Sequence, residues 1–418
     1  MTAATAFQAG SPPNLTQVQG DFYVPGYRVF IKGKEHPELV KDILSVSYND
    51  SLTNVDSVDL VINNWDPEKH MSKEGAQGGF LYSDDSVFNP WQDIEVQMGY
   101  FQNGEKSLKQ MLVGEIVTMA PNFPASGGST LAVRALNLLH QFRTEQKTLQ
   151  FKQLTDSQIA NKIVEDINKD IKKKLTHIKL RMDPDEIKSN IADNNEKPHD
   201  YIEMHHQYPI VFLMQRSRDI GYDISVEDKV DLDKKNRTIT FHYKSSGGVL
   251  RSVYELEWGK SLISFQPTLQ TAKQVNAVTV RGWNVQTKKP IEETATRAEL
   301  VKLGEKTIQP EDLAVSENSL AQKLEIVVDR GFKNPQVAKE VAKKILRQLA
   351  QGLVEAKGKT IGLPDLRSGS KVQIGGLGRF NGTYLVTSTT HTIGDGGYTT
   401  DFSARMEAKG DPKQGGQK

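Results

Sequence analysis

Apolar and polar residues alternate along the C-terminal part of the chain. Over residues 384–393 every second side chain falls on the same face, which predicts an antiparallel strand. One face is expected to hold Tyr384, Val386 and Ser388, and the other Leu385, Thr387, Thr389, His391 and Ile393. The segment IGDGGY supplies turn residues, and alternation resumes at Thr400, Phe402, Ala404 and Met406. The pattern predicts a β-hairpin.

Three blocks of β-type sequence occur twice, in the same order. The first pairs LVINNWD at residues 60–66 with VTVRGWN at residues 278–284. The second pairs VQMG at residues 96–99 with VQIG at residues 372–375. The third pairs a strand and turn beginning at Gly114 with another beginning at Gly382.

The third block has the most regular spacing. In each copy nine positions separate a strand Thr from the first Gly of the turn, and an Arg follows: Thr118, Gly127 and Arg134, against Thr387, Gly396 and Arg405. Three blocks in one order indicate a true repeat rather than coincidence. We therefore predict two repeated antiparallel β-barrels made of short strands.

Helical periodicity appears between the two copies. Thr155 and Gln158 form a capping box, which predicts that a helix begins there. Its apolar face is expected to hold Ile159, Ile163, Val164, Ile167 and Ile171. A second helix is predicted near residues 209–220, ending at Gly221, with strands at residues 222–227 and 238–244. This segment reads as an α+β domain.

A further helix is predicted inside the second copy. Asn334 is expected to cap it, with Pro335 at its first position, and Gly358 is a plausible stop. The predicted apolar face holds Val337, Val341, Ile345 and Leu349. The fold class is accordingly α+β, mainly β, with two repeated antiparallel β-barrels and an intervening α+β domain.

These patterns divide the chain into segments. We expect a flexible N-terminal arm, a first β-barrel, a middle α+β domain, a second β-barrel with a helical insertion at about 292–358, and a flexible tail: residues 1–19, 20–145, 146–272, 273–408 and 409–418.

Composition narrows the function classes. The 418 residues include no cysteine, which excludes disulfides, thiolate catalysis and cysteine-ligated zinc. The formal net charge is +1 with both signs mixed along the chain, so no nucleic-acid partner is expected. The apolar runs are shorter than a membrane span, so direct membrane insertion is not expected, and the N-terminus lacks the pattern of a signal peptide.

Two segments invite a chemical interpretation. GGLGRFNG, at residues 375–382, is rich in glycine, but a strand-like TYLVTSTT follows where a phosphate loop needs a helix. HDYIEMHH contains His199, Glu203, His205 and His206, and the first two would share a helix face as metal ligands. A polar strand leading into the helix at Pro209 is the favoured reading.

Other candidate sites are weaker. The acidic segments at residues 48–59 and 182–190 lack the spacing of a calcium loop, and no GxSxG motif occurs. We therefore assign no catalytic, cofactor-binding or metal-binding residue and expect no cofactor. Core packing is the favoured role of the tryptophans, Trp65, Trp91, Trp258 and Trp283, over an exposed aromatic platform.

Several of these motifs together resemble a known family. They are AVTVRGWNVQTKKPI at residues 277–291, NGTYLVTSTTHTIGDGGYTTDFSARM at residues 381–406, and the helix after Thr155 followed by residues 209–221. The chain resembles the baseplate hub proteins of contractile phage tails, also called phage late control D proteins. The same module forms the hub portion of VgrG in type VI secretion and in extracellular contractile injection systems. The resemblance covers roughly residues 20–408.

The resemblance implies a structural protein rather than an enzyme. Tail tubes of this family are sixfold and spikes are threefold, so three chains with two barrels each would join them as a homotrimer around an open channel. The implied partners are a trimeric spike protein, tail-tube or tube-initiator proteins and baseplate wedge proteins. VgrG continues into an OB domain and a needle that this chain lacks, which implies a separate spike polypeptide.

The implied place of action is the baseplate of a phage tail or injection particle, assembled in the bacterial cytoplasm. The middle domain and the helix after Asn334 are expected to face away from the tube or toward the spike. Two alternatives stay open from the sequence: a tail-tip cell-wall hydrolase, and a carbohydrate- or receptor-binding β-protein. The sequence does not distinguish a phage from an injection system.

Overall fold

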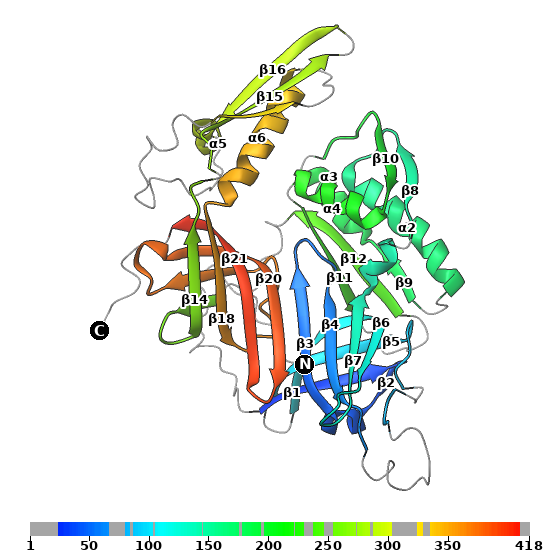
Figure 1. The fold of residues 1–418 in the computed structure, drawn as a ribbon. Coiled ribbons are helices and arrows are strands. Elements are labelled where there is room, and N and C mark those ends of the chain that lie inside the picture. The colour runs from blue at the N-terminus through cyan, green and yellow to red at the C-terminus, as the bar shows by residue number, and fades with distance from the viewer. Residues whose placement is uncertain are drawn as a thin grey trace.

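The computed structural model describes residues 24–66, 80–83, 87–102, 105–143, 145–174, 178–193, 196–220, 222–229, 237–245, 254–272, 274–284, 287–302, 324–328 and 335–409. A 13-stranded sheet dominates the described part of the chain, accompanied by three smaller sheets and the helices (Figure 1). The predicted fold class, α+β and mainly β, is confirmed. Among the described residues, no helix is both long and apolar enough to cross a membrane.

The N-terminal strands form the first β-unit. In chain order they are β1 (Val24–Ile31), β2 (Lys34–Glu35), β3 (Ile43–Ser51), β4 (Ser57–Asn63), β5 (Asp93–Gln102), β6 (Glu105–Asn122) and β7 (Thr130–Asn137), with the 3-10 helix η1 (Pro37–Lys41) before β3. The strands lie in the order β3-β4-β7-β6-β5-β1-β2 and every neighbouring pair is antiparallel.

The middle segment combines helices with two small sheets. Its elements are η2 (Leu138–Arg143), β8 (Lys147–Phe151), α2 (Asp156–Lys174), β9 (Ile178–Arg181), α3 (Pro184–Asp193), β10 (Ile202–Gln207), α4 (Pro209–Ile220), β11 (Tyr222–Lys229) and β12 (Arg237–Ser245). The sheets run β10-β8 and β11-β12-β9. Ile159, Ile163 and Ile167 of α2 lie in its core, as predicted, whereas the Gly221 stop lies outside the described residues.

The second β-unit closes the chain. Its strands are β13 (Tyr254–Glu257), β14 (Leu262–Leu269), β18 (Val354–Ile361), β19 (Lys371–Gly375), β20 (Gly382–Gly394) and β21 (Gly397–Lys409). β13 and β14, which fall within the segment 146–272 expected to form the middle domain, pair with β19 and β18. Gly375–Gly382 contains the short 3-10 helix η5 (Gly378–Phe380) and leads into β20, so the glycine-rich loop opens a strand, as predicted.

A separate small unit lies between β14 and β18. It contains β15 (Ala277–Asn284), β16 (Lys289–Thr296), α5 (Arg297–Lys302), β17 (Leu324–Val328) and α6 (Pro335–Gln351), and Figure 1 shows it projecting beyond β14 and β18. The sheet order is β16-β15-β17. Asn334, the predicted cap of α6, lies outside the described residues.

The predicted buried face of α6 is wrong by one position. The fully buried residues are Ala338, Ala342 and Leu346, whereas Val337 is 43% exposed. The predicted Val341, Ile345 and Leu349 pack only partly against this core. Small alanine side chains let the helix backbone approach the sheet closely, so they occupy the centre of the contact and the larger apolar residues lie on its flank.

The prediction that side chains alternate strictly along β20 is also wrong. The register against β21 shifts between Val386 and Ser388, so Thr387 is an extra residue at a β-bulge. Tyr384 and Val386 are therefore buried on the same side as Thr389, His391 and Ile393. The bulge moves the side-chain phase by one residue, which no pattern of period two reveals.

Five strands of each β-unit lie in the same order. The order β3-β4-β7-β6-β5 in the first unit matches β14-β18-β21-β20-β19 in the second, and all the pairs are antiparallel. The two orders use the strands in the same chain sequence. This supports the predicted repeat and shows that the small unit of α6 is inserted between the first and second strands of the second copy.

The alignment of the three sequence blocks needs correction. The first block is wrong, because its second member lies in β15 of the small sheet and the counterpart of β4 is β18. The second block identifies the right strands but is offset by two residues, since Val96 and Ile374 hold equivalent places opposite Leu112 and Gly382. In the third block the strands correspond, but the counterpart of Arg134 is Ser403, opposite the bulge, rather than Arg405.

Candidate assembly surface

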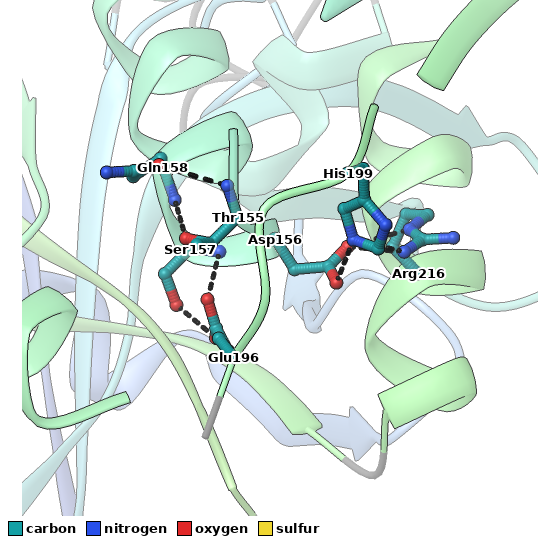
Figure 2. A network of polar contacts seen from close by, with 7 residues as sticks. All are labelled: Thr155, Asp156, Ser157, Gln158, Glu196, His199 and Arg216. Atoms are coloured by element: carbon teal, nitrogen blue, oxygen red, sulfur yellow. Dashed lines mark hydrogen bonds and ion pairs between the residues drawn. The ribbon is translucent and has the colours of Figure 1, made fainter. Parts of the chain in front are cut away.

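His199, the main candidate for a metal ligand, is part of an ion-pair network at the start of α2 (Figure 2). Its Nε2 lies 2.8 Å from Oδ2 of Asp156, and the Arg216 guanidinium lies 2.7 Å from the other carboxylate oxygen. Burial raises the pKa of the Asp156 carboxyl, but the His199 hydrogen bond and the Arg216 charge outweigh it and leave this pKa lowered. His199 therefore has a structural role, in which it stabilises the ionised carboxylate of Asp156.

The capping box at the same helix start is formed as predicted. The backbone N–H of Thr155 donates to Oε1 of Gln158 at 3.0 Å, and the Gln158 N–H points back to Oγ1 of Thr155 at 3.4 Å. Glu196 accepts from the backbone N–H and the hydroxyl of Ser157, also drawn in Figure 2. These contacts join α2 to the chain before β10.

The remaining histidines of the HDYIEMHH segment lie on β10, in a strand as favoured. His205 is 3.8 Å from Glu203 and most of its side chain is exposed. His206 has a left-handed backbone, with φ of 48°, and its N–H donates to Oγ1 of Thr148. Within the described ranges, no group of three or more His, Asp or Glu side chains is arranged to hold a metal ion.

The two acidic segments have structural partners. Asp183 accepts a hydrogen bond from the N–H of Asp185 and so caps α3. Asp59 pairs with Arg134 on the neighbouring strand at 2.9 Å. Asp50 is buried where the two β-units meet, and Asp56 is half-buried near it.

The expectation that the tryptophans pack in the core is wrong for three of them. Trp91, Trp258 and Trp283 are 61%, 60% and 47% exposed, and only Trp65 is half-buried. They lie before β5, after β13 and within β15, so they belong to three different parts of the fold. Apolar neighbours in the sequence are a poor guide here, because they do not determine which face of a strand end is turned toward solvent.

The two β-units meet where β20 pairs with β3. The pairing is antiparallel and joins Ser388–Ile393 to Ser51–Val46, so that one continuous sheet crosses both units (Figure 1). We call this contact the seam. Ile393 and Tyr398, from the second unit, lie in the hydrophobic core of the first. The units are therefore one packed body at this contact.

Side chains on the other face of the seam are small and polar. Ser47 Oγ lies 2.9 Å from Oγ1 of Thr392, and the Thr390 hydroxyl donates to Oδ1 of Asn49 at 2.9 Å. Cross-strand hydroxyl and amide pairs stabilise antiparallel strands. The face toward the core thus combines apolar side chains with buried polar ones such as Asp50 and His391, and the face away from it is polar and uncharged.

A half-buried cationic side chain reinforces the seam. Arg367, from the second unit, donates to the carbonyl oxygen of Gln110 at 3.1 Å in β6 of the first. The next residue, Ser368, donates its N–H to Oδ2 of Asp50 at 2.8 Å and its hydroxyl to Oδ1. The loop before β19 therefore binds both backbone and carboxylate groups of the first unit.

Two titratable groups at the seam have pKa values shifted toward their neutral forms. Burial raises the pKa of Asp56 to about 7, with the Asp50 carboxylate adding to the effect and Arg367 opposing it. Burial and the Arg367 charge lower the pKa of His391 to about 3. His391 contacts the Tyr398 hydroxyl through Nδ1 and the Leu366 carbonyl oxygen through Nε2. Both ring nitrogens of His391 therefore have hydrogen-bond partners inside the core.

Comparison with protein families gives one match. The family model described as the Alg8 N-terminal domain matches residues 23–184 and 238–395, which together make up more than half of the chain. None of the curated proteins compared with the chain matches it.

Solved structures with the same fold include two tail proteins. The 43 kDa tail protein of prophage MuSo2 from Shewanella oneidensis is 14% identical, with a TM-score of 0.59, over 92% of this chain and 100% of the other. The Neisseria meningitidis MC58 tail protein is 12% identical, also at 0.59, over 92% and 97%. The half-lidded Francisella PdpA-VgrG complex contains a chain 10% identical, at 0.50, over 95% and 60%. At these identities the likeness shows the fold.

Proposed function

The chain belongs to the Alg8 N-terminal domain family, and we propose that it is the structural hub of a contractile tail or contractile injection system. In this proposal it joins a sixfold tail tube to a threefold spike and performs no catalysis. The fold it shares with phage tail proteins supports this role.

One observation carries the proposal: a single chain contains two β-units with the same strand order, joined edge to edge at the seam. Three such chains present six similar units around one axis, which is what a sixfold tube requires. The same three chains present only three middle segments, which suits a threefold spike. A trimer of this kind resolves the symmetry mismatch without a further adaptor.

The proposed partners follow from this geometry. They are a trimeric spike protein, tube or tube-initiator subunits on the face formed by the β-units, and baseplate wedge proteins at the rim. The domain limits proposed are those expected from the sequence, with three changes. Residues 254–269 join the second β-unit, because β13 and β14 pair there. Leu138–Arg143 joins the middle segment, and the inserted unit runs from Ala277 to Gln351 in place of about 292–358. The proposed location is the baseplate of a tail or injection particle assembled in the bacterial cytoplasm.

The decisive experiment is a native mass measurement of the purified chain, alone and mixed with a candidate spike protein from the same source. A trimer of the 46.6 kDa chain is expected in at least the mixture. A stable dimer or hexamer, or a monomer that binds no spike, would contradict the adaptor role.

The enzymatic alternative is tested separately. Purified protein is incubated with peptidoglycan, and released soluble fragments are measured beside a lysozyme control. The hub proposal expects release no greater than in buffer. Saturable release that depends on protein concentration would favour a cell-wall hydrolase instead.

A further inference from the structure

The seam uses two strands whose counterparts in the repeat have open edges. β3 pairs with β4 on one edge and β20 on the other, whereas β14, its counterpart, pairs only with β18 among the described strands. β20 pairs with β19 over its first half and β3 over its second. Its counterpart β6 pairs with β5 up to Glu115, and no described strand pairs with that edge beyond this point.

We propose that these two open edges bind each other between copies of the chain. Residues 118–123 of one copy lie antiparallel against β14 of a second copy, in the arrangement that β20 and β3 adopt within the chain. This inference rests on the proposed hub function, and it explains how copies of the hub bind one another. The two surfaces are residues 118–123 of one copy and β14 of the other, and the register is that of the seam.

Two pairs of β-bulges fix the register. The β3–β4 register shifts between Ile43 and Ser45, and the β14–β18 register shifts between Leu262 and Ser264, so Leu44 and Ile263 are equivalent. In the same way Val117 of β6 and Thr387 of β20 are equivalent. Transferring the seam pairs through these bulges places Met119 opposite Leu269, Ala120 opposite Thr268, Asn122 opposite Gln266, and Phe123 opposite Phe265.

The two open edges carry apolar residues at positions equivalent to buried positions of the seam. Ile393, at the end of the seam, is 6% exposed, whereas its counterpart Phe123 is 57% exposed. On the other edge, Val46 is fully buried in the seam, and its counterpart Phe265 is only partly buried against the second core. A large aromatic side chain left in solvent beside an open strand edge is typical of a surface that a partner covers.

The opposite face of the proposed contact matches the seam in polarity. The seam presents Ser47, Asn49 and Ser51 beside Thr392, Thr390 and Ser388. The counterparts are Gln266, Thr268 and Gln270 beside Asn122, Ala120 and Thr118, which are exposed and uncharged. Neither face would bury an unpaired charge, so a second copy can dock without a large desolvation cost.

Two prolines distinguish the proposed contact from the seam. Transfer of the register places Pro121 opposite Pro267, where the seam has His391 opposite Tyr48. Proline has no N–H, so hydrogen bonds are lost at this pair, while the pairs on either side keep their donors. Proline on an edge strand also hinders pairing with unrelated strands. The contact is thus held by side chains at its two ends.

The proposed contact is head to tail, because it joins β6 of one copy to β14 of the next. A head-to-tail contact forms a ring when its rotation closes. Because each contact repeats the geometry of the seam, every β-unit in the ring would have similar neighbours.

The absence of cysteine allows a direct test. Ala120→Cys and Thr268→Cys are made together in the full chain and oxidised. Their seam counterparts, Thr390 and Asn49, have side-chain oxygens 2.9 Å apart, so two cysteines would meet at disulfide distance. Asn49→Cys with Thr390→Cys is the positive control and should give a bond within one chain. Ala120→Cys with Lys357→Cys, one strand further away, should give none.

The expected result is a covalent series ending at trimer in denaturing electrophoresis. Separate chains that carry Ala120→Cys or Thr268→Cys alone should give no bond, and their mixture should give a covalent dimer. If the native mass shows a trimer but the double variant stays uncross-linked, this inference fails while the hub proposal stands. A chain that forms no oligomer with or without its spike overturns both. Bonds between two Ala120→Cys chains would show a symmetric contact and also overturn the inference.

Discussion

The guanidinium carbon of Arg367 lies 4.4 Å from the centre of the Tyr48 ring. The two residues belong to different copies of the repeat; at the seam Tyr48 is buried and Arg367 is half-buried. A cation over an aromatic face is attracted to it most strongly when water is excluded. This pair fastens the loop before β19 to β3 and makes the seam a specific contact rather than two strand edges that happen to meet.

Replacing Arg367 should destabilise the whole molecule. Arg367→Met removes the cation over Tyr48 and leaves the carboxyl groups of Asp50 and Asp56 without the nearby charge of Arg367. Losing the cation–π contact and the hydrogen bond to the Gln110 carbonyl should together cost about 1–3 kcal/mol. Chemical unfolding measures the loss. Arg379→Met is the matched control, because Arg379 also lies over an aromatic ring, Phe380, but is exposed. An equal effect of the two variants would contradict the seam's role.

Asp56 should make the stability depend on pH. Its pKa in the folded protein is raised to about 7, so the folded state favours the protonated form. The contribution of Asp56 to the free energy of unfolding is complete below about pH 4, the pKa of an Asp in the unfolded chain. It is lost as the pH rises toward 7. Relative to Asp56→Asn, the wild type should lose up to about 1.4 kcal/mol per pH unit in this window. The lowered pKa of His391 has the opposite effect on the pH dependence, but it is present in both proteins and cancels in their difference.

The measurement is the free energy of unfolding of wild type and Asp56→Asn at pH 5, 6, 7 and 8. The difference between the two proteins should shift in favour of the variant with rising pH and level off above 7. A constant difference across this range would show that Asp56 does not titrate there.

Gly358 should not tolerate a methyl group. An added Cβ would lie 2.3 Å from Cζ of Phe402, whose ring occupies this space in the second β-unit. Gly358→Ala is expected to cost about 1–3 kcal/mol, as overpacking of cores usually does. At Gly375, no described atom lies within 4 Å of the added Cβ, so Gly375→Ala should change the thermal midpoint little. Equal midpoints for both variants would disprove the packing argument.

His199 should act through Asp156 and not through a metal. His199→Ala removes the hydrogen bond to the carboxylate and should cost about 1–3 kcal/mol, the usual value for a bond to a charged group. A chelator should leave the thermal midpoint of the wild type unchanged. His205→Ala, on the exposed side of β10, should have almost no effect. A midpoint that falls with chelator in the wild type but not in His199→Ala would restore the metal interpretation.

Interactions between residues close together in the sequence allowed much of the fold to be predicted. The capping box at Thr155 and the turn in IGDGGY depend only on neighbouring residues, and the structure forms both. The repeat was visible because equivalent strands need similar alternation, even where the match was offset by two residues. The same local pattern misassigned Trp283, because β15 and β4 are similar strands placed in different sheets.

Only the tertiary structure decided how the two copies meet. The bulge at Thr387 moves β20 from one core to the next, and nothing in its own sequence fixes the partner on its far side. Arg367 and Tyr48 are 319 positions apart, so their contact depends on the path of the whole chain. The burial of Ala338 in place of Val337 likewise depends on how near α6 lies to its sheet. Sequence determines which strands form, because that is a matter of side-chain period and turns; which edges remain open is determined by packing over long distances.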